Sequence, residues 1–181
     1  MANKVCYWFS ELSIHDVGRV GGKNASLGEM INFLQPLGIN IPDGFATDAE
    51  AFRYFLDSNG VSVKLEELML TLDTMHFSNL NQISLATKKL ISKASLSSEL
   101  KDAIGNHNQA LCEKHGRELD VAVRSSATAE DLPTASFAGQ HDSFLNIRGV
   151  DSVIEAVHKC FASLYNARAI KYRIDNEAKH L

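Results

Sequence analysis

The fold class of this chain is decided at residues 119–124, which read Leu119-Asp120-Val121-Ala122-Val123-Arg124. The run is short and rich in β-branched residues, and it follows a long stretch that has neither proline nor a β-rich segment. We therefore expect a buried strand here. A polar loop covers residues 125–140, and a second β-rich run, Ser143-Phe144-Leu145-Asn146-Ile147, predicts a returning strand. A further short strand is expected at residues 5–9.

Outside these strands, apolar residues recur at helical spacing. Predicted helices cover residues 27–37, about 48–60, three segments between 61 and 115, and 153–164. The first two each begin near a Ser/Thr-x-x-Glu capping box, at residues 26–29 and 47–50. We expect an α+β (mixed) fold in which helices pack on a small sheet, with a helical scaffold at about residues 48–117.

The composition excludes several classes of function. The 181 residues include 18 Lys and Arg against 22 Asp and Glu, which gives a formal net charge of −4. This mild acidity argues against a nucleic-acid partner, which would favour a concentrated basic patch. No apolar run is long enough for a transmembrane helix, and the N-terminus lacks the features of a secretory leader. We expect a cytoplasmic protein without nucleic-acid or membrane partners.

Cysteine and histidine side chains give no signal for a metal or for catalysis. Cys6, Cys112 and Cys160 lie far apart and are odd in number, so they predict neither a disulfide framework nor a CxxC metal site. We expect three reduced thiols with structural roles. The histidines are scattered without metal-ligand spacing. No metal ligand and no catalytic residue is therefore predicted in this chain.

The first segment that breaks the scaffold pattern is Gly21-Gly22-Lys23, immediately before the first predicted helix. Paired glycines tolerate positive φ and let backbone N–H groups approach an anion closely. A helix N-terminus adds unpaired donors and a favourable dipole, and the lysine adds a mobile cation. The segment suits the phosphates of a nucleotide, although it lacks the spacing of a Walker A loop. The alternative is a glycine-rich turn with a solvated lysine.

The second segment begins at Arg124, at the end of the predicted strand. A guanidinium group can grip phosphate oxygens in a bidentate way, and it is followed by hydroxyl donors, Ser125, Ser126, Thr128 and Thr134. The alternative is that Arg124 only pairs with Glu130 or Asp131. Residues 136–143 then place small residues around Phe137, which predicts either a flap over phosphates or a plain hairpin turn.

At these residues the sequence resembles a known family. The motifs are Val20-Gly21-Gly22-Lys23-Asn24-Ala25-Ser26-Leu27-Gly28-Glu29-Met30, residues 41–47, residues 123–133, residues 135–140, and Phe161-Ala162-Ser163-Leu164-Tyr165 with Arg168 and Arg173. In this order they are similar to the ATP-binding domain shared by phosphoenolpyruvate synthases (pyruvate, water dikinases), pyruvate phosphate dikinases and rifampicin-phosphorylating enzymes. The variant Asn24-Ala25-Ser26 favours the synthases.

The resemblance implies the N-terminal lobe of an ATP-grasp-like nucleotide-binding domain. In that family, ATP gives its β-phosphoryl group to a histidine on another domain, which then phosphorylates pyruvate, and the products are phosphoenolpyruvate, AMP and phosphate. Carried over to matching positions, Lys23 and Arg124 would grip the ATP phosphates, beside Gly21 and Gly22. Gly139 would let the flap approach them, and Ser143 would add a hydroxyl contact. Phosphate-binding segments are thus expected at about residues 18–30 and 121–147.

Two positions depart from the family pattern. Ser143 stands where threonine is common, and Ala167 stands where an aspartate often precedes the family's arginine, which puts a role for Arg168 in doubt. The later half of the ATP-binding domain has no counterpart before Leu181, and neither has the histidine carrier or the pyruvate-binding domain. We therefore expect the ligands of Mg²⁺ to lie outside this chain.

The missing parts also set the expected partners and activity. We expect the 181 residues to be inactive by themselves, with ATP, pyruvate, the remaining enzyme domains and a possible homo-oligomer as partners. The alternative is a nucleotide-binding module, or a relative of rifampicin phosphotransferases, without pyruvate activity.

Overall fold

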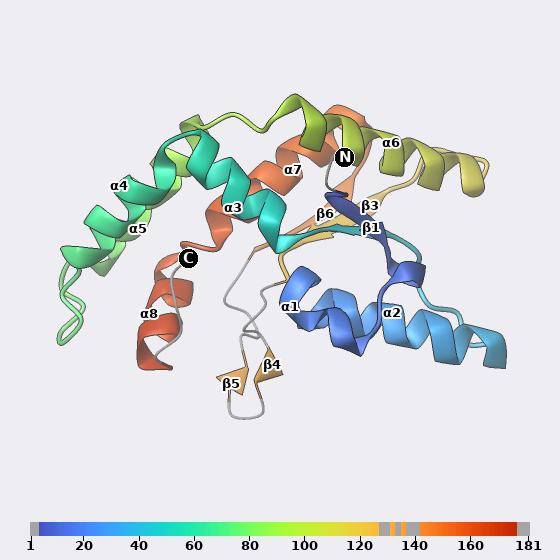
Figure 1. Cartoon of the computed structure of the whole chain (residues 1–181), viewed down its shortest axis with the longest axis horizontal. Coiled ribbons are helices and arrows are strands. Elements are labelled where there is room, and N and C mark those ends of the chain that lie inside the picture. Colours follow the sequence, from blue (N-terminus) through green and yellow to red (C-terminus); the bar gives the residue numbers. More distant parts are fainter. Residues whose placement is uncertain (1–3, 127–130, 133–134, 137–141, 177–181) are drawn as a thin grey trace.

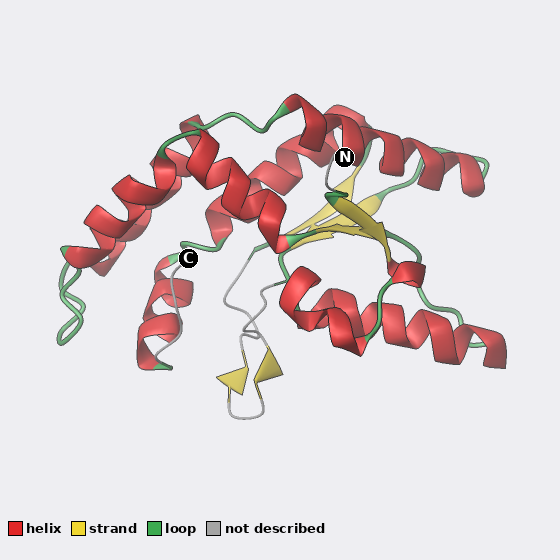
Figure 2. Cartoon of the chain, viewed as in Figure 1, coloured by secondary structure: helices red, strands yellow, loops and turns green. Residues whose placement is uncertain are grey.

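The computed structural model of the chain describes residues 4–126, 131–132, 135–136 and 142–176. Helices dominate it (Figure 2). The α-helices are α1 (Val17–Val20), α2 (Gly22–Leu34), α3 (Ala49–Ser58), α4 (Val61–Leu70), α5 (Leu80–Lys93), α6 (Ser98–Lys114), α7 (Val150–Ser163) and α8 (Ala167–Asp175). The short 3-10 helices are η1 (Phe9–Glu11), η2 (Ile14–Asp16) and η3 (Gln35–Leu37).

The described strands form three separate antiparallel ribbons of two strands each. They are β1 (Cys6–Trp8) with β2 (Phe45–Thr47), β3 (Val121–Arg124) with β6 (Ser143–Ile147), and β4 (Asp131–Leu132) with β5 (Ala135–Ser136). Figure 1 shows α6 and α7 on one side of the first two ribbons, and α1 and α2 on the other. This confirms the expected mixed fold with helices packed on small sheets.

Two apolar clusters hold these layers together. The larger one joins α3, α5, α6, α7 and the inner face of the β3–β6 ribbon, with Phe55, Ile91 and Ile104 almost fully buried at its centre. The smaller one lies under α2 and consists of Leu12, Val20, Ala25 and Ala46. The start of α2 therefore rests on a packed base of its own.

The two predicted capping boxes were wrong in detail. Helix α2 begins at Gly22 rather than near Leu27, so Ser26 lies inside it, and the Glu29 carboxylate accepts a hydrogen bond from the backbone N–H of Ile14 (3.0 Å). Helix α3 is capped by Asp48, whose side chain accepts from the N–H of Ala51 (2.7 Å). In α2, Glu29 bonds to the backbone of Ile14 instead of closing a capping box. In α3, Asp48 caps the helix in place of Thr47.

The basic residues near the end of the chain differ in their surroundings, and only Arg173 is part of the packed interior. The Arg173 side chain is buried, and its guanidinium lies 5.1 Å from the centre of the Tyr165 ring. Lys171 pairs with Asp175 at 2.6 Å on the outer face of α8, while Arg168 is exposed. None of the described helices has the length and apolarity that a membrane span requires.

The packing of α2 against the backbone of Leu12 can be tested by a substitution at Gly28. A Cβ atom at Gly28 would lie 2.5 Å from the backbone oxygen of Leu12, whereas one at Gly18 would meet nothing within 4 Å. We predict that Gly28→Ala lowers the free energy of unfolding by about 1–3 kcal/mol, because backbone cannot move aside easily. Gly18→Ala, the matched control, should be neutral or slightly stabilising. Urea unfolding followed by circular dichroism measures both; equal stabilities would contradict this packing.

The thiols should differ in reactivity. Burial raises the pKa of Cys6 and of Cys160 to about 12 each, with Asp48 and Asp142 adding smaller electrostatic effects, while Cys112 is only half-buried. Because the thiolate is the reactive form, we predict one fast and two slow thiols toward a disulfide reagent at pH 8, and three fast ones after unfolding. Three fast thiols in the native protein would contradict the burial of Cys6 and Cys160.

Candidate functional site

Helix α2 begins against the end of β3, and Gly21 makes this approach possible. Gly21 caps the helix with φ 81° and ψ 160°, a conformation that is essentially restricted to glycine. A Cβ atom there would lie 2.2 Å from the backbone oxygen of Ser126. No other residue type fits, so this glycine serves close backbone contact as well as the turn.

A hydrogen bond joins the same two segments. The backbone N–H of Asn24 donates to the Ser126 hydroxyl at 3.3 Å, across 102 positions of sequence. The Asn24 side-chain amide donates to the carbonyl of Val20 at 2.8 Å, which ties the end of α1 to the first turn of α2. The segment that carries Lys23 is thereby fixed beside the segment that carries Arg124. Sequence reasoning did not assign a role to Asn24.

Arg124 and Ser143 are neighbours across the β3–β6 ribbon. They are paired in its register, and the side chains of both are exposed. Along β3, Val121 and Val123 pack on the large cluster, so Arg124 belongs to the opposite, open face. The predicted arginine and the predicted hydroxyl thus lie side by side at the end of the ribbon that adjoins α2.

The six predicted binding residues differ in burial and in whether the structure describes them. Gly21 and Gly22 are buried at the start of α2, and Lys23 is half-buried in its first turn, inside the helix rather than before it. Gly139 lies outside the described residues. The alternative partners of Arg124 are not described either, because Glu130 and the side chain of Asp131 fall outside that part of the chain.

A polar network that sequence reasoning missed fixes the start of β6. The Asn166 amide donates to the Asp142 carboxylate at 3.1 Å, and the Asn166 carbonyl oxygen accepts from Lys88 at 2.8 Å. Beside it, the Ser84 hydroxyl donates to the backbone oxygen of Tyr165 at 2.8 Å. The residue before Ser143 is therefore tied to α5 and to the α7–α8 turn. A single asparagine between two helices gives no periodic signal, which is why it was not found.

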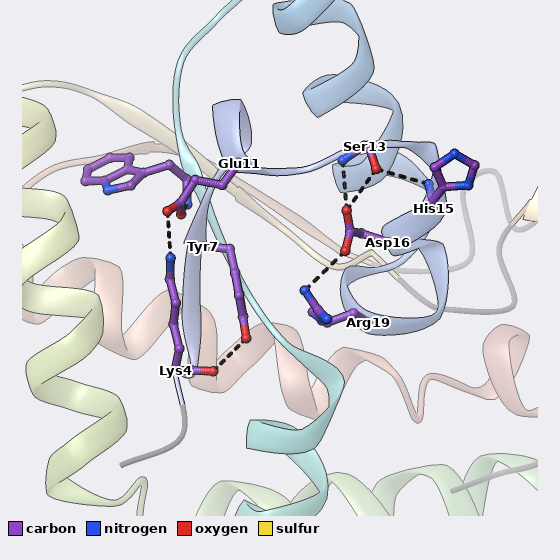
Figure 3. Close-up of polar contacts among 8 residues, drawn as sticks. Lys4, Tyr7, Glu11, Ser13, His15, Asp16 and Arg19 are labelled. Atoms are coloured by element: carbon purple, nitrogen blue, oxygen red, sulfur yellow. Dashed lines mark hydrogen bonds and ion pairs between the residues drawn. The ribbon is translucent and has the colours of Figure 1, made fainter. Parts of the chain in front are cut away.

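A second group of charges lies beside β1 and α1. A cavity of about 360 Å³ is lined there by Lys4, Arg19, Arg53, Asp48 and Glu50, together with Tyr7. Figure 3 shows that Lys4 reaches Glu11 (2.7 Å) and that Arg19 reaches Asp16 (3.2 Å). Arg19 belongs to the expected phosphate-binding segment but points to its own carboxylate partner. The charge of Arg19 is thus paired within its own segment.

The described residues offer no metal centre of their own. Among residues 4–126 and 142–176 and the two short strands between them, no three His, Cys, Asp or Glu side chains gather in a way that could hold an ion. The start of α2 instead brings a helix N-terminus that carries a lysine beside a strand end that carries an arginine and a hydroxyl, and groups of this kind suit an anion.

Comparison with known proteins identifies the family of the chain. The family described as "Pyruvate phosphate dikinase, AMP/ATP-binding domain" matches residues 17–181. The chain belongs to this family of nucleotide-binding domains.

Three curated relatives are each called phosphoenolpyruvate synthase. The chain is 48% identical to the one from Synechocystis sp. over 178 residues (96% of this chain, 22% of the relative). It is 47% identical to that of Neisseria meningitidis serogroup B (99% and 23%) and 45% identical to that of Escherichia coli strain K12 (96% and 22%). The chain spans about a fifth of the length of these relatives.

The contact between Gly21 and Ser126 can be tested with a matched pair of glycines. Gly21 and Gly149 have nearly the same backbone conformation, with φ of 81° and 82° and ψ of 160° and 149°, but a Cβ atom at Gly149 would lie at an ordinary 3.6 Å from the Glu118 carboxylate. We predict that Gly149→Ala costs about 1–3 kcal/mol of unfolding free energy, from backbone strain alone. Gly21→Ala should cost about 2 kcal/mol more than that, because it adds the collision with Ser126. Equal losses in thermal or urea unfolding would mean that the two segments are not in contact.

Proposed function

We propose that the chain binds ATP through its phosphates, with Lys23 and Arg124 as the two cationic contacts. Gly21 and Gly22 would present backbone at the start of α2, Gly139 would let the flap approach, and Ser143 would donate its hydroxyl. The observation that carries this proposal is the approach of Gly21 to Ser126, because it joins the two candidate segments. The family's description as an AMP/ATP-binding domain supports the choice of ligand.

Each proposed contact matches a feature of a phosphate chain. A lysine in the first turn of a helix adds a mobile charge where the dipole already favours an anion. An arginine at a strand end presents a planar fork that fits two phosphate oxygens at once. Ser143 lies across the ribbon from Arg124, so its hydroxyl and the guanidinium can reach the same group. Together they would bind one triphosphate from two sides.

We further propose that the chain is the ATP-binding part of a phosphoenolpyruvate synthase. In that reaction a phosphoryl group of ATP passes through a histidine carrier to pyruvate, and phosphoenolpyruvate, AMP and phosphate are formed. The name shared by relatives at 45–48% identity supports a synthase over an enzyme that modifies rifampicin or a module without pyruvate activity. The chain's own part would be to bind ATP and orient it.

The proposed contacts would also lower the barrier to transfer. Phosphoryl transfer depends on positioning and on neutralising charge at the phosphate oxygens, which Lys23 and Arg124 would supply in part. We propose that the ligands of Mg²⁺ lie outside this chain, and no step is derived through the ion; in the described part of the chain, no three His, Cys, Asp or Glu side chains gather to hold one. We likewise place no catalytic residue in it.

The proposal predicts a loss of ATP affinity on removal of either cation. Lys23→Ala and Arg124→Ala should each weaken ATP binding about tenfold to a hundredfold, as expected for a hydrogen bond to a charged group. Arg124→Lys should lie between Arg124→Ala and the wild type, because it keeps the charge but loses the bidentate fork. Isothermal titration calorimetry at fixed ionic strength measures all three variants.

Arg148→Ala is the matched control for these variants. Arg148 is an exposed arginine beyond the other end of the same β3–β6 ribbon, where it pairs with Asp120 at 2.7 Å. Its removal should leave ATP affinity unchanged. If Lys23→Ala and Arg124→Ala bind ATP as the wild type does, or if Arg148→Ala weakens binding equally, the assigned phosphate site is wrong.

A further inference from the structure

Three side chains form a line of hydrogen bonds from α5 to the start of β6. The Lys88 ammonium on α5 donates to the side-chain oxygen of Asn166 at 2.8 Å, and the Asn166 amide donates to the Asp142 carboxylate at 3.1 Å. All three residues are half-buried. The two bonds span 78 and 24 positions of sequence, so they fix the tertiary arrangement and not a local turn.

Asn166 occupies the N-cap position of α8 but does not cap that helix. Asparagine is among the preferred N-cap residues, because its side-chain oxygen can accept from the first free N–H groups of a helix. Here the side chain makes no such bond, and its two polar groups bond to Lys88 and Asp142 instead. The tertiary contacts have displaced the local one, which indicates that this side chain serves more than the start of α8.

The backbone around Asn166 is firmly held. Tyr165 is almost fully buried, and its backbone oxygen accepts from the buried Ser84 hydroxyl at 2.8 Å. The backbone oxygen of Asn166 accepts from the N–H of Ile170, a fully buried residue, at 2.9 Å. Site residues keep their geometry when the residues that support them are locked by packing and hydrogen bonds. Asn166 meets this condition.

The other end of this line of hydrogen bonds lies next to the proposed phosphate site. Asp142 directly precedes Ser143, the first residue of β6, and Ser143 is paired with Arg124 in the register of the ribbon. Among the described strands, β3 and β6 have only each other as neighbours. The position of this end of the ribbon therefore depends on contacts outside the ribbon, and the bond from Asn166 supports its β6 side.

We propose that Asn166 is a positioning residue for ATP binding, because through Asp142 it fixes the place of Ser143. The inference rests on the proposed phosphate site, in which Ser143 acts together with Arg124. Asn166 acts only through these residues. It keeps the hydroxyl beside the guanidinium, so that both can reach the same phosphate group.

The same hydrogen bonds also control a negative charge. A carboxylate next to a phosphate contact repels the phosphate oxygens. The Asn166 amide turns its carbonyl to the Lys88 ammonium and its N–H to Asp142, so its dipole favours both charges. The Asp142 carboxylate is thereby held on Asn166, where it does not compete with a phosphate for the Ser143 hydroxyl.

An exchange of the two side chains tests the proposal. Asn166→Asp places two carboxylates against each other and should weaken ATP binding about tenfold. When Asp142→Asn is added, an amide at position 142 can donate to a carboxylate at position 166, which still accepts from Lys88. The double variant should therefore bind ATP within about twofold of Asp142→Asn alone. Isothermal titration calorimetry compares these three variants with the wild type.

Two results of this exchange would overturn the proposal. The first is an ATP affinity that Asn166→Asp leaves unchanged. The second is a loss of affinity of the same size with and without Asp142→Asn, because Asn166 would then not act through Asp142. If Asn166→Asp does not fold, as judged by circular dichroism, Asn166→Ala removes the bond without adding a charge. It should weaken ATP binding about threefold to tenfold, and an unchanged affinity would again overturn the proposal.

Asn59→Asp is the matched control for a general loss of stability. Asn59 lies at the C-terminal end of α3 and also bridges two segments, since its amide donates to the backbone oxygens of Phe55 (2.8 Å) and Ser95 (3.1 Å). Its substitution should lower the free energy of unfolding and leave ATP affinity unchanged. If Asn59→Asp weakens ATP binding as much as Asn166→Asp does, loss of stability explains both results and the proposal is wrong.

A measurement without ATP keeps this proposal separate from the phosphate site. The backbone amide resonances of Ser143 and Arg124 should shift in Asn166→Asp, and the double variant should return them to their positions in Asp142→Asn. Resonances that do not move would overturn the proposal, whatever the ATP affinity.

The cation variants show which of the two proposals fails. If Lys23→Ala and Arg124→Ala weaken ATP binding but Asn166→Asp does not, the phosphate site stands and the positioning role is wrong. If both cation variants bind ATP as the wild type does, the phosphate site is wrong, and the role of Asn166 in ATP binding falls with it.

Discussion

The architecture of the candidate site depends on one close contact, between the backbone of Gly21 and the backbone of Ser126. It requires a residue without a Cβ atom in a conformation that other residues avoid, and it is reinforced by the hydrogen bond from Asn24 to the Ser126 hydroxyl. Through this contact the N-terminus of α2 is held at the open end of the β3–β6 ribbon. Two motifs that lie far apart in sequence are thereby held in contact, so the segment that carries Lys23 lies beside the segment that carries Arg124.

The long motifs of this sequence combine residues for binding with residues for packing. In residues 20–30, Gly21 approaches Ser126 beside the candidate site, while Gly28 and Glu29 hold α2 against the loop at residues 12–14. In the last motif, Tyr165 and Arg173 stack on each other in the interior. A signature of this kind therefore marks a rigid platform for a ligand, and only a few of its members need touch that ligand.

Local patterns predicted most of the elements. The strand at residues 143–147 and the helices around Phe55, Ile91 and Ile104 follow directly from periodicity. The start of α2 was misplaced because apolar periodicity begins at Leu27, whereas the helix actually begins where Gly21 meets Ser126. The pairing of Arg124 with Ser143 could not be derived, since the ribbon contains a register shift between Val121 and Val123. The polar link through Asn166 likewise depends on tertiary contacts that no local pattern encodes.

The central claim is that one phosphate chain touches both segments at once. Titration of ¹⁵N-labelled protein with ATP, followed through backbone amide resonances, tests it most directly. We predict that the amides of Gly21, Gly22 and Lys23 shift together with those of Arg124 and Ser143, and that all of them follow a single binding curve. Shifts confined to one of the two segments, or centred on α4 and α5 instead, would contradict the account.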